Sequence, residues 1–378
     1  MQKKLIALAI AGLSSTAFAQ STVTIQGLFD TGYFNQSQEA AGVKTKTNRW
    51  GSASNSATTN VTFVVQEDLG GGMKAGLWLE TDPVAGQGNS NGVAASTTAG
   101  TTGFLNSQNY LWVSGGFGKV SLGFMNNFAL TSALAAQPFG VGMGGGYSGQ
   151  FGRLSGVNVI GQPAAVAMGG NTAGARDIRA NNSVKWDSTN FAGFTAGLLY
   201  RSPNSNGANT GFDADGQTQV GLNYNNGPFN ISYAHSNILS NINAAGAVGG
   251  AGLNTGVTTH NLLGANFTFG PATIYAGWTS SKNTGVANTP TVDGRSWNVA
   301  LKWQATPSIA VMANVLRQDD KLVADSDRNL NALGLDYAMS KRTSAYVRWE
   351  DGDNDKSAVA GAATGKFTRT ALGLKHTF

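Results

Sequence analysis

The nonapeptide TALGLKHTF, residues 370–378, alternates between two kinds of side chain. Leu372, Leu374, His376 and Phe378 fall on one parity, and small or polar residues fall on the other. Successive side chains of a β-strand point to opposite faces, so this alternation predicts a strand with one apolar face and one polar face. A soluble chain usually finishes in a frayed polar tail. The apolar face therefore implies an apolar environment up to the last residue.

The same period of two recurs along the chain. In STVTIQGLFDTGYF (21–34), MKAGLWLET (73–81) and SWNVALKWQ (296–304), apolar residues alternate with small or polar ones. A helix would scatter these apolar residues around its axis. No run of about 18 apolar residues is present, which excludes a helical membrane protein. The pattern predicts sixteen strands, near residues 21–35, 57–68, 73–84, 106–114, 118–125, 182–188, 191–201, 217–226, 229–238, 258–269, 272–281, 294–304, 307–318, 328–338, 342–350 and 366–378.

The connections between these strands alternate strictly between tight turns and long polar segments. A transmembrane β-barrel sorts its connections in this way, with an even strand number, short periplasmic turns and long external loops. Closure pairs every strand edge, as the bilayer interior demands. We therefore predict an all-β fold, a 16-stranded antiparallel transmembrane β-barrel wide enough to hold an aqueous channel. The long segments are 36–56, 85–105, 126–181, 202–216, 239–257, 282–293, 319–327 and 351–365.

The first nineteen residues, MQKKLIALAIAGLSSTAFA, predict a secretory signal peptide. They carry Lys3 and Lys4, a short apolar stretch, and a small-residue ending at Ala17 and Ala19. The apolar stretch is too short to cross a bilayer as an anchor. The predicted organisation is thus a signal peptide over 1–19 followed by a barrel over 20–378.

Five stretches spread over the chain carry a family resemblance: QEDLGGGMKAGLWLE (66–80), LWVSGGFGKVSLG (111–123), NNSVKWDSTNFAGFTAGLLY (181–200), LDYAMSKRTSAYVRWE (335–350) and GLKHTF (373–378). They resemble the general porins of Gram-negative bacteria, in particular the trimeric sixteen-stranded type of β-proteobacteria.

The resemblance implies a homotrimer in the bacterial outer membrane, in contact with the lipid bilayer and lipopolysaccharide. Such a channel passes small hydrophilic solutes by passive diffusion. The resemblance also implies that the third external loop, here 126–181, folds into the lumen as a constriction. Phe378 would then be the signal that the outer-membrane assembly machinery reads.

The charged residues predict how such a channel treats ions. Aligned on the resembling motifs, Asn60, Ser107 and Phe124 stand where the family commonly has arginines. This departure, with few charges on the long third loop, predicts a weakly anion-preferring or nearly non-selective pore. The candidate pore-lining and constriction residues are Arg153, Arg176, Asp177, Arg179, Lys185, Lys302, Arg348, Arg369 and Glu80.

Specific metal or phosphate sites are not supported by the motifs. GAATGKFT (361–368) is one residue short of a phosphate-binding loop and has Phe367 where a hydroxyl is needed. DGDNDKS (351–357) has aspartates at calcium-loop spacing but Lys356 in place of the required glycine. We expect no cofactor and no specific metal site. The acidic external loops are expected to hold divalent cations only loosely, where these bridge lipopolysaccharide.

Catalysis and nucleic-acid binding find little support. The chain has no cysteine, and no histidine stands at an informative spacing from a nucleophilic serine and a carboxylate. The 25 Lys and Arg nearly balance the 20 Asp and Glu, which does not suggest nucleic acid. We therefore expect no catalytic residues and no enzymatic activity.

Most tryptophans fall within predicted strands, which favours aromatic girdles at the two membrane interfaces. Trp78 and Trp112 have the lumen parity, which would suit an aromatic path for sugars, but two rings are too few to favour it. The sequence thus predicts a general porin. The alternatives are a solute-specific channel with a saturable binding site and, less favoured, an outer-membrane hydrolase.

Overall fold

A computed structural model describes residues 21–40, 43–51, 56–83, 105, 107–145, 179–202, 216–240, 256–285, 290–321, 328–354 and 365–378. The predicted signal peptide lies outside the described residues. So does 146–178, which holds three of the candidate constriction residues, Arg153, Arg176 and Asp177.

Seventeen strand segments and one helix make up the described fold. They are β1 (Thr22–Ala40), β2 (Val43–Gly51), β3 (Asn60–Gly70), β4 (Met73–Thr81), β5 (Asn109–Gly115), β6 (Gly118–Asn126), α2 (Phe128–Ala135), β7 (Arg179–Asp187), β8 (Phe194–Arg201), β9 (Gly216–Asn226), β10 (Phe229–Ser240), β11 (Gly256–Phe269), β12 (Ala272–Gly285), β13 (Pro290–Thr306), β14 (Ile309–Asp320), β15 (Arg328–Ala338), β16 (Thr343–Asn354) and β17 (Gly365–Thr377).

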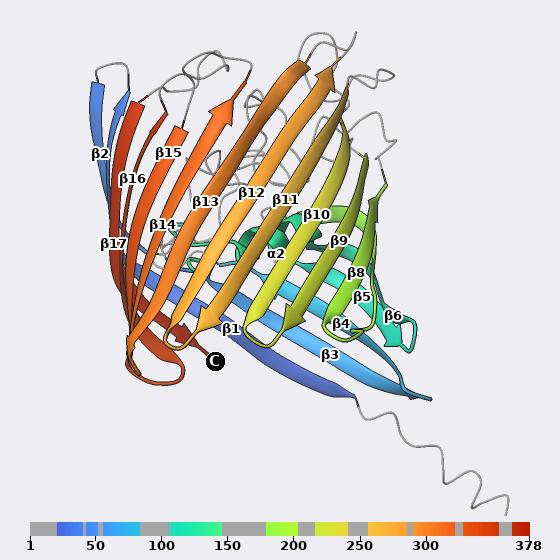
Figure 1. The fold of residues 1–378 in the computed structure, drawn as a ribbon. Coiled ribbons are helices and arrows are strands. Elements are labelled where there is room, and N and C mark those ends of the chain that lie inside the picture. Colours follow the sequence, from blue (N-terminus) through green and yellow to red (C-terminus); the bar gives the residue numbers. More distant parts are fainter. Residues whose placement is uncertain are drawn as a thin grey trace, which may run out of the picture.

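The strands form one antiparallel sheet that closes into a barrel (Figure 1). β1 pairs with β17 along one edge, from Leu28 opposite Thr377 to Ala40 opposite Gly365. Along its other edge β1 pairs first with β3 and then with β2. β2 and β3 therefore share one position in the wall, and the barrel has sixteen strand positions. This confirms the predicted 16-stranded antiparallel barrel.

The prediction that 36–56 is a loop was wrong. β1 continues to Ala40 and β2 occupies 43–51, so most of this stretch is a hairpin. The expected strand 57–68 begins only at Asn60. In VKTKTNRWG (43–51) both faces are mostly polar, so the alternation of apolar and polar residues that marks the other strands is missing. Backbone pairing with β1 and cross-strand contacts, such as Trp50 with Tyr33 and Arg49 over Phe34, hold this strand in place.

The wall has an apolar outer face, as its sequence alternation predicts, and an inner face that carries most of the buried polar side chains together with apolar clusters such as Leu316, Leu330 and Phe367. In β17, Leu372 and Leu374 are 54% and 51% exposed, whereas Arg369 and Ala371 are 2% exposed. The outer face carries exposed apolar side chains all around the barrel, which suits a hydrocarbon environment. The apolar parity of TALGLKHTF is thus the outward parity.

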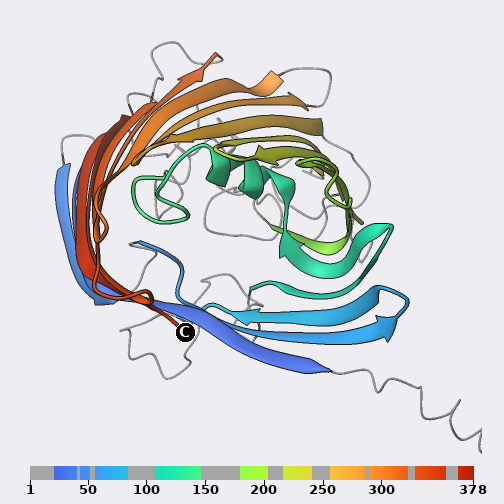
Figure 2. The same cartoon turned by 60° about the horizontal axis from the view of Figure 1, so that its bottom comes forward.

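Residues 127–145, here called the inner segment, follow β6 and run along the inside of the barrel. Figure 2 shows α2 and the turns after it enclosed by the ring of strands. α2 contacts β9, β10, β11 and β12. The side chain of Asn127 caps the helix by accepting from the amide of Leu130 at 3.2 Å. Among the described residues, no helix is both long and apolar enough to span a bilayer.

Candidate functional site: the channel wall and its inner segment

Phe128 seats the helical end of the inner segment on a part of the wall lined by glycine. Its ring occupies the space over Gly197 on β8 and Gly221 on β9, where an added Cβ would come within 2.2 Å and 2.3 Å of it. The amide of Phe128 donates to Oε1 of Gln219 at 3.0 Å. Two glycines in neighbouring strands thus form the socket for one aromatic ring.

Asparagine side chains on the wall receive the carboxyl end of α2. The last carbonyls of a helix have no partner within the helix. Asn266 on β11 donates to the carbonyl oxygen of Ala135 at 2.9 Å, and Asn298 on β13 donates to that of Ala136 at 2.7 Å. The wall therefore completes the hydrogen bonding of the helix end.

Gly144 fastens the far end of the inner segment. Its amide donates to Oε2 of Glu350 on β16 at 2.7 Å, and its carbonyl accepts from Nδ2 of Asn314 on β14 at 2.8 Å. Gly144 has φ +95°, and an added Cβ would lie 2.4 Å from the ring of Phe139. Glycine is thus required here both by backbone conformation and by space.

The inner face of β15, β16 and β17 carries two ion pairs. Arg369 pairs with Glu350, and both side chains are almost fully buried. Arg348 Nη2 lies 2.6 Å from Oδ1 of Asp336, and it also donates to Oγ of Ser56 at 3.1 Å. Arg348 and Arg369 are therefore each paired with a carboxylate on the adjacent strand.

Between β2 and β3 the chain turns toward the lumen at residues 56–59, here called the inward turn. The carboxylate of Asp30, on the inner face of β1, accepts from the amides of Ser56 and Ala57, both at 2.8 Å. The hydroxyl of Tyr346 donates to the same carboxylate at 2.5 Å. A single buried carboxylate on β1 thus organises the inward turn.

The side chain of Thr59 hydrogen-bonds the backbone of β1 at the point where neither β2 nor β3 pairs with it. Its hydroxyl accepts from the amide of Asp30 and donates to the carbonyl of Asp30, with both oxygen distances at 3.0 Å. The paired residues of β1 on either side are Leu28, which faces Asn60, and Gly32, which faces Gly51. One side chain replaces the missing backbone partner at this position.

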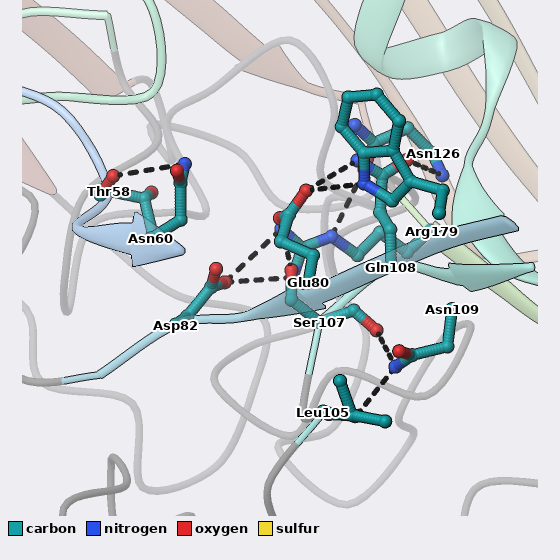
Figure 3. Close-up of polar contacts among 11 residues, drawn as sticks. Thr58, Asn60, Glu80, Asp82, Leu105, Ser107, Gln108, Asn109, Asn126 and Arg179 are labelled. Carbon is teal, nitrogen blue, oxygen red and sulfur yellow. Dashed lines mark hydrogen bonds and ion pairs between the residues drawn. The ribbon is translucent and has the colours of Figure 1, made fainter. Parts of the chain in front are cut away.

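Glu80 is the centre of a second cluster, on the inner face of β4 (Figure 3). It accepts from Nε1 of Trp78 at 2.9 Å, from Oγ of Ser107 at 2.5 Å and from Nε2 of Gln108 at 3.0 Å. Ser107, which stands where the resembling family commonly has an arginine, is thus a hydrogen-bond donor to Glu80.

Arg179, at the start of β7, brings positive charge to this cluster (Figure 3). Its Nη2 lies 3.6 Å from Oε1 of Glu80 and 3.4 Å from Oδ2 of Asp82. Its Nε donates to Oδ1 of Asn126 at 3.1 Å, next to the beginning of the inner segment. Burial raises the pKa of Asp82 to about 6; Arg179 opposes this rise and Glu80 adds to it.

Two further predicted lumen cations, Lys185 and Lys302, lie on the inner face of the wall. Nζ of Lys185 lies 3.2 Å from Oδ1 of Asp187 and 4.4 Å from the ring centre of Phe128. Lys302 occupies an inner position of β13, in register with Met312, which is buried. Arg153, Arg176 and Asp177 are not placed, because they lie outside the described residues.

Sequence reasoning missed the groups that fasten the inner segment and the inward turn. Asp30, Asn298 and Asn314 all have the inner parity of their strands, but an inner polar residue is ordinary in a channel wall. Only their contacts with residues far along the chain distinguish them. Tyr110 was also missed; it stacks on Trp78 with ring centres 6.1 Å apart.

Two comparisons identify the family of the chain. The sequence profile of the family described as Gram-negative porin matches residues 5–357. Among curated relatives, outer membrane porin protein 32 of Delftia acidovorans is 28% identical, with all of both chains aligned. An outer membrane porin protein of Bordetella pertussis is 26% identical, again over the whole of both chains.

Solved structures show the same fold. The anion-selective porin from Comamonas acidovorans superimposes with a TM-score of 0.73 at 24% identity, over 95% of this chain and 100% of that one. The outer-membrane channel DcaP of Acinetobacter baumannii superimposes with a TM-score of 0.61 at 12% identity, over 95% of this chain and 97% of that one. The family match, the closed barrel and the polar inner wall agree, and the chain belongs to the Gram-negative porin family of outer-membrane channels.

Proposed function

We propose that this porin is a general, passive channel for small hydrophilic solutes, with a weak preference for anions and with its third loop, 126–181, as the constriction. One observation carries this proposal. The inner segment, the first part of that loop, is hydrogen-bonded to wall side chains from β9 to β16. Such a segment reduces the free cross-section of the lumen at a fixed height.

The charges of the inner wall support weak rather than strong selectivity. Glu80, Asp187, Asp336 and Glu350 each lie within ion-pair distance of an arginine or lysine. Paired charges largely cancel each other's field at the distance of a passing ion. The inner face also carries the carboxylates of Asp30 and Asp82, and against these the cationic groups of Arg49, Lys119, Arg201 and Lys302. The resulting small excess of positive charge favours anions.

Reconstitution in a planar lipid bilayer tests this proposal. Under a potassium chloride gradient, the reversal potential should be small and should have the sign expected when chloride permeates more easily than potassium. Conductance should rise linearly with salt concentration, as expected for passive flux. A reversal potential of clear cation sign would contradict the anion preference, and saturating conductance in potassium chloride would contradict general diffusion.

We also propose that the porin assembles as a homotrimer, as its family resemblance implies. Closure of one reconstituted particle in three equal conductance steps supports this state. A single closing step from fully active, cross-linked particles would contradict it. Channel function, rather than enzymatic activity, is what family membership supports.

Phe378 is proposed as a signal for the outer-membrane assembly machinery. Its amide donates to the carbonyl of Gly27 at 3.1 Å, and its carbonyl accepts from the amide of Gly27 at 3.2 Å. Phe378→Ala keeps these backbone bonds but removes the ring, whereas deletion removes both. If recognition depends on the ring, both variants should insert at reduced yield, and normal insertion of Phe378→Ala would contradict the proposal.

Loose divalent-cation binding at the external acidic loops is proposed only as a lipopolysaccharide bridge. Asp319 pairs with Arg295 at 3.1 Å, and Asp353 accepts from Asn329. Within the part of the chain that the structure describes, no group of three or more His, Cys, Asp and Glu side chains has metal-binding geometry. Chelation should therefore release lipopolysaccharide without changing conductance, and a change in conductance alone would contradict this role.

A further inference from the structure

Three aromatic side chains lie together on the inner face of the wall, and we call them the aromatic platform: Trp78, Tyr110 and Trp112. Trp78 on β4 is directly opposite Tyr110 on β5, and their rings are stacked with centres 6.1 Å apart and planes 8° apart. Trp112 follows two residues later on the same face of β5. Leu111 between them is 46% exposed on the outer face, so the platform faces the lumen and is not part of a lipid-facing girdle.

The residues beside the platform are small, which lets its rings lie along the wall. Gly76 faces Trp112 across β4 and β5, and an added Cβ at Gly76 would lie 2.5 Å from the indole ring. On the other side, Ser121 faces Trp112 and Gly123 faces Tyr110. Larger side chains at these positions would push the rings off the wall. All three rings remain partly exposed.

A lysine ammonium stands beside the platform. Nζ of Lys119 on β6 lies 5.4 Å from the ring centre of Tyr110 and 5.7 Å from that of Trp112. Both distances are within the range of cation–π attraction, and the ammonium lies over the rings of Tyr110 and Trp112. Asp187 faces Lys119 across β6 and β7. The platform and Lys119 together present an aromatic surface with one ammonium over it, and the carboxylates of Glu80 and Asp187 lie at its margins.

Resting on the proposed channel function, we propose that the aromatic platform and Lys119 form a weak binding site for small aromatic carboxylates that cross the lumen. The ring of such a solute stacks on the part of the Trp112 and Tyr110 rings that the Lys119 ammonium does not cover, where offset aromatic contacts are favourable. Its carboxylate lies beside the Lys119 ammonium and forms a charge-assisted contact. Both groups of the solute are satisfied at once, which neither an aliphatic carboxylate nor an aromatic amine can achieve.

The position of the site along the channel fits a role in passage. A short turn joins β4 to β3, and another joins β5 to β6. Short turns are periplasmic in this class of barrel. Trp112 lies three residues before Gly115, the last residue of β5 at its turn. Farther from the turn, Glu80 and Arg179 form the cluster described above. A solute that leaves this cluster therefore reaches the platform before the periplasmic mouth.

Single-channel recording of the full chain with benzoate as the probe tests the proposal. Benzoate should reduce the potassium chloride current saturably, whereas cyclohexanecarboxylate, of equal charge but without a planar ring, should need a higher concentration. Benzylamine, which has the ring but a positive charge, should not block. Trp112→Ala should raise the half-blocking concentration of benzoate about fivefold, the loss expected for one aromatic contact.

Matched variants separate the site from general effects. Lys119→Gln should also weaken the block, whereas Arg295→Gln, which removes a 56% exposed cation near the external end of β13, should leave it unchanged. Trp112→Phe keeps a ring and should retain most of the block. If Trp112→Ala and Lys119→Gln conduct normally and are blocked by benzoate like the wild type, the inference is overturned, and the platform only stabilises the wall.

The failure of this inference would be distinct from failure of the proposed function. A channel that conducts potassium chloride in linear fashion but shows no saturable effect of benzoate remains a general porin without this site. A chain that forms no conducting pore would overturn the proposed function itself.

Discussion

Glu350 accepts a hydrogen bond from the backbone amide of Gly144 at 2.7 Å while it pairs with Arg369 on the neighbouring strand. Glu350 and Gly144 are 206 positions apart in the chain, and each belongs to a different part of the channel, the wall and the inner segment. A charge that belongs to the wall therefore also positions the inner segment. Changes to this carboxylate should affect stability and conductance together.

Glu350→Gln should destabilise the folded barrel by about 3 kcal/mol, because it leaves the buried guanidinium of Arg369 without its anion. Heat or urea unfolding of the detergent-solubilised barrel measures this loss. The double variant Glu350→Gln with Arg369→Met removes both charges and should recover most of the stability. A double variant that is no more stable than Glu350→Gln would show that the ion pair is not the cause.

Arg348→Ala and Arg369→Ala should each shift the reversal potential toward cations, since each removes a positive charge from the inner wall and leaves a carboxylate behind. Bilayer recording in a salt gradient measures the shift. Arg295→Ala is the matched control, because Arg295 is 56% exposed and pairs with Asp319 near the external end of β13. Equal reversal potentials for all four proteins would place Arg348 and Arg369 outside the path of the ions.

Anion preference should increase as the pH falls through about 6, where Asp82 takes up a proton. Burial raises the pKa of this carboxyl above its ordinary value, so it is ionised at neutral pH and neutral in mild acid. Its protonation leaves the charge of Arg179 less compensated. By linkage, the raised pKa also means that acidification through this range stabilises the folded state.

Asp82→Asn is the control for this titration. It should show the stronger anion preference already at neutral pH and little further change on acidification. The measurement is the reversal potential in a salt gradient at a series of pH values. An unchanged pH dependence in Asp82→Asn would assign the titration to another group.

Thr59→Val should destabilise the barrel by about 2 kcal/mol or more, because it removes the hydroxyl that satisfies both the amide and the carbonyl of Asp30. Valine has nearly the shape of threonine, so packing changes little. Thr59→Ser keeps the hydroxyl and should lose much less. Unfolding in urea compares the variants, and equal losses for valine and serine would mean that the methyl group, not the hydroxyl, matters.

The period of two predicted the strands and their faces, because lipid outside and water inside impose opposite requirements on successive side chains, and the alternation of tight turns with long loops predicted the barrel. Leu372, Leu374 and Arg369 lie on the predicted faces for this reason. β2 escaped prediction because a strand that is mostly polar on both faces has no such contrast. The local pattern thus predicts the strands that face the membrane, and it misses a strand whose two faces are both polar.

The candidate site was less predictable, because its contacts join residues that no local pattern links. Parity places Glu80 in the lumen but says nothing of Ser107 or Arg179 as its partners. The aromatic platform was underestimated for a similar reason. Trp78 and Trp112 were judged too few, and the tyrosine that joins them became evident only from strand register.

The hydroxyl of Thr59 has a consequence for how this barrel can diverge. A transmembrane wall normally tolerates no gap, since an open backbone group in hydrocarbon is costly. Here the pairing of β1 passes from β3 to β2 across three residues, and the described residues 56–59 make an excursion from the wall toward the lumen. The number of residues in that excursion is therefore uncoupled from strand register. Insertions and deletions between Gly51 and Ser56 should therefore accumulate among homologues without opening the barrel. The segment that enters the lumen can vary at this position while the pairing of the wall strands is conserved.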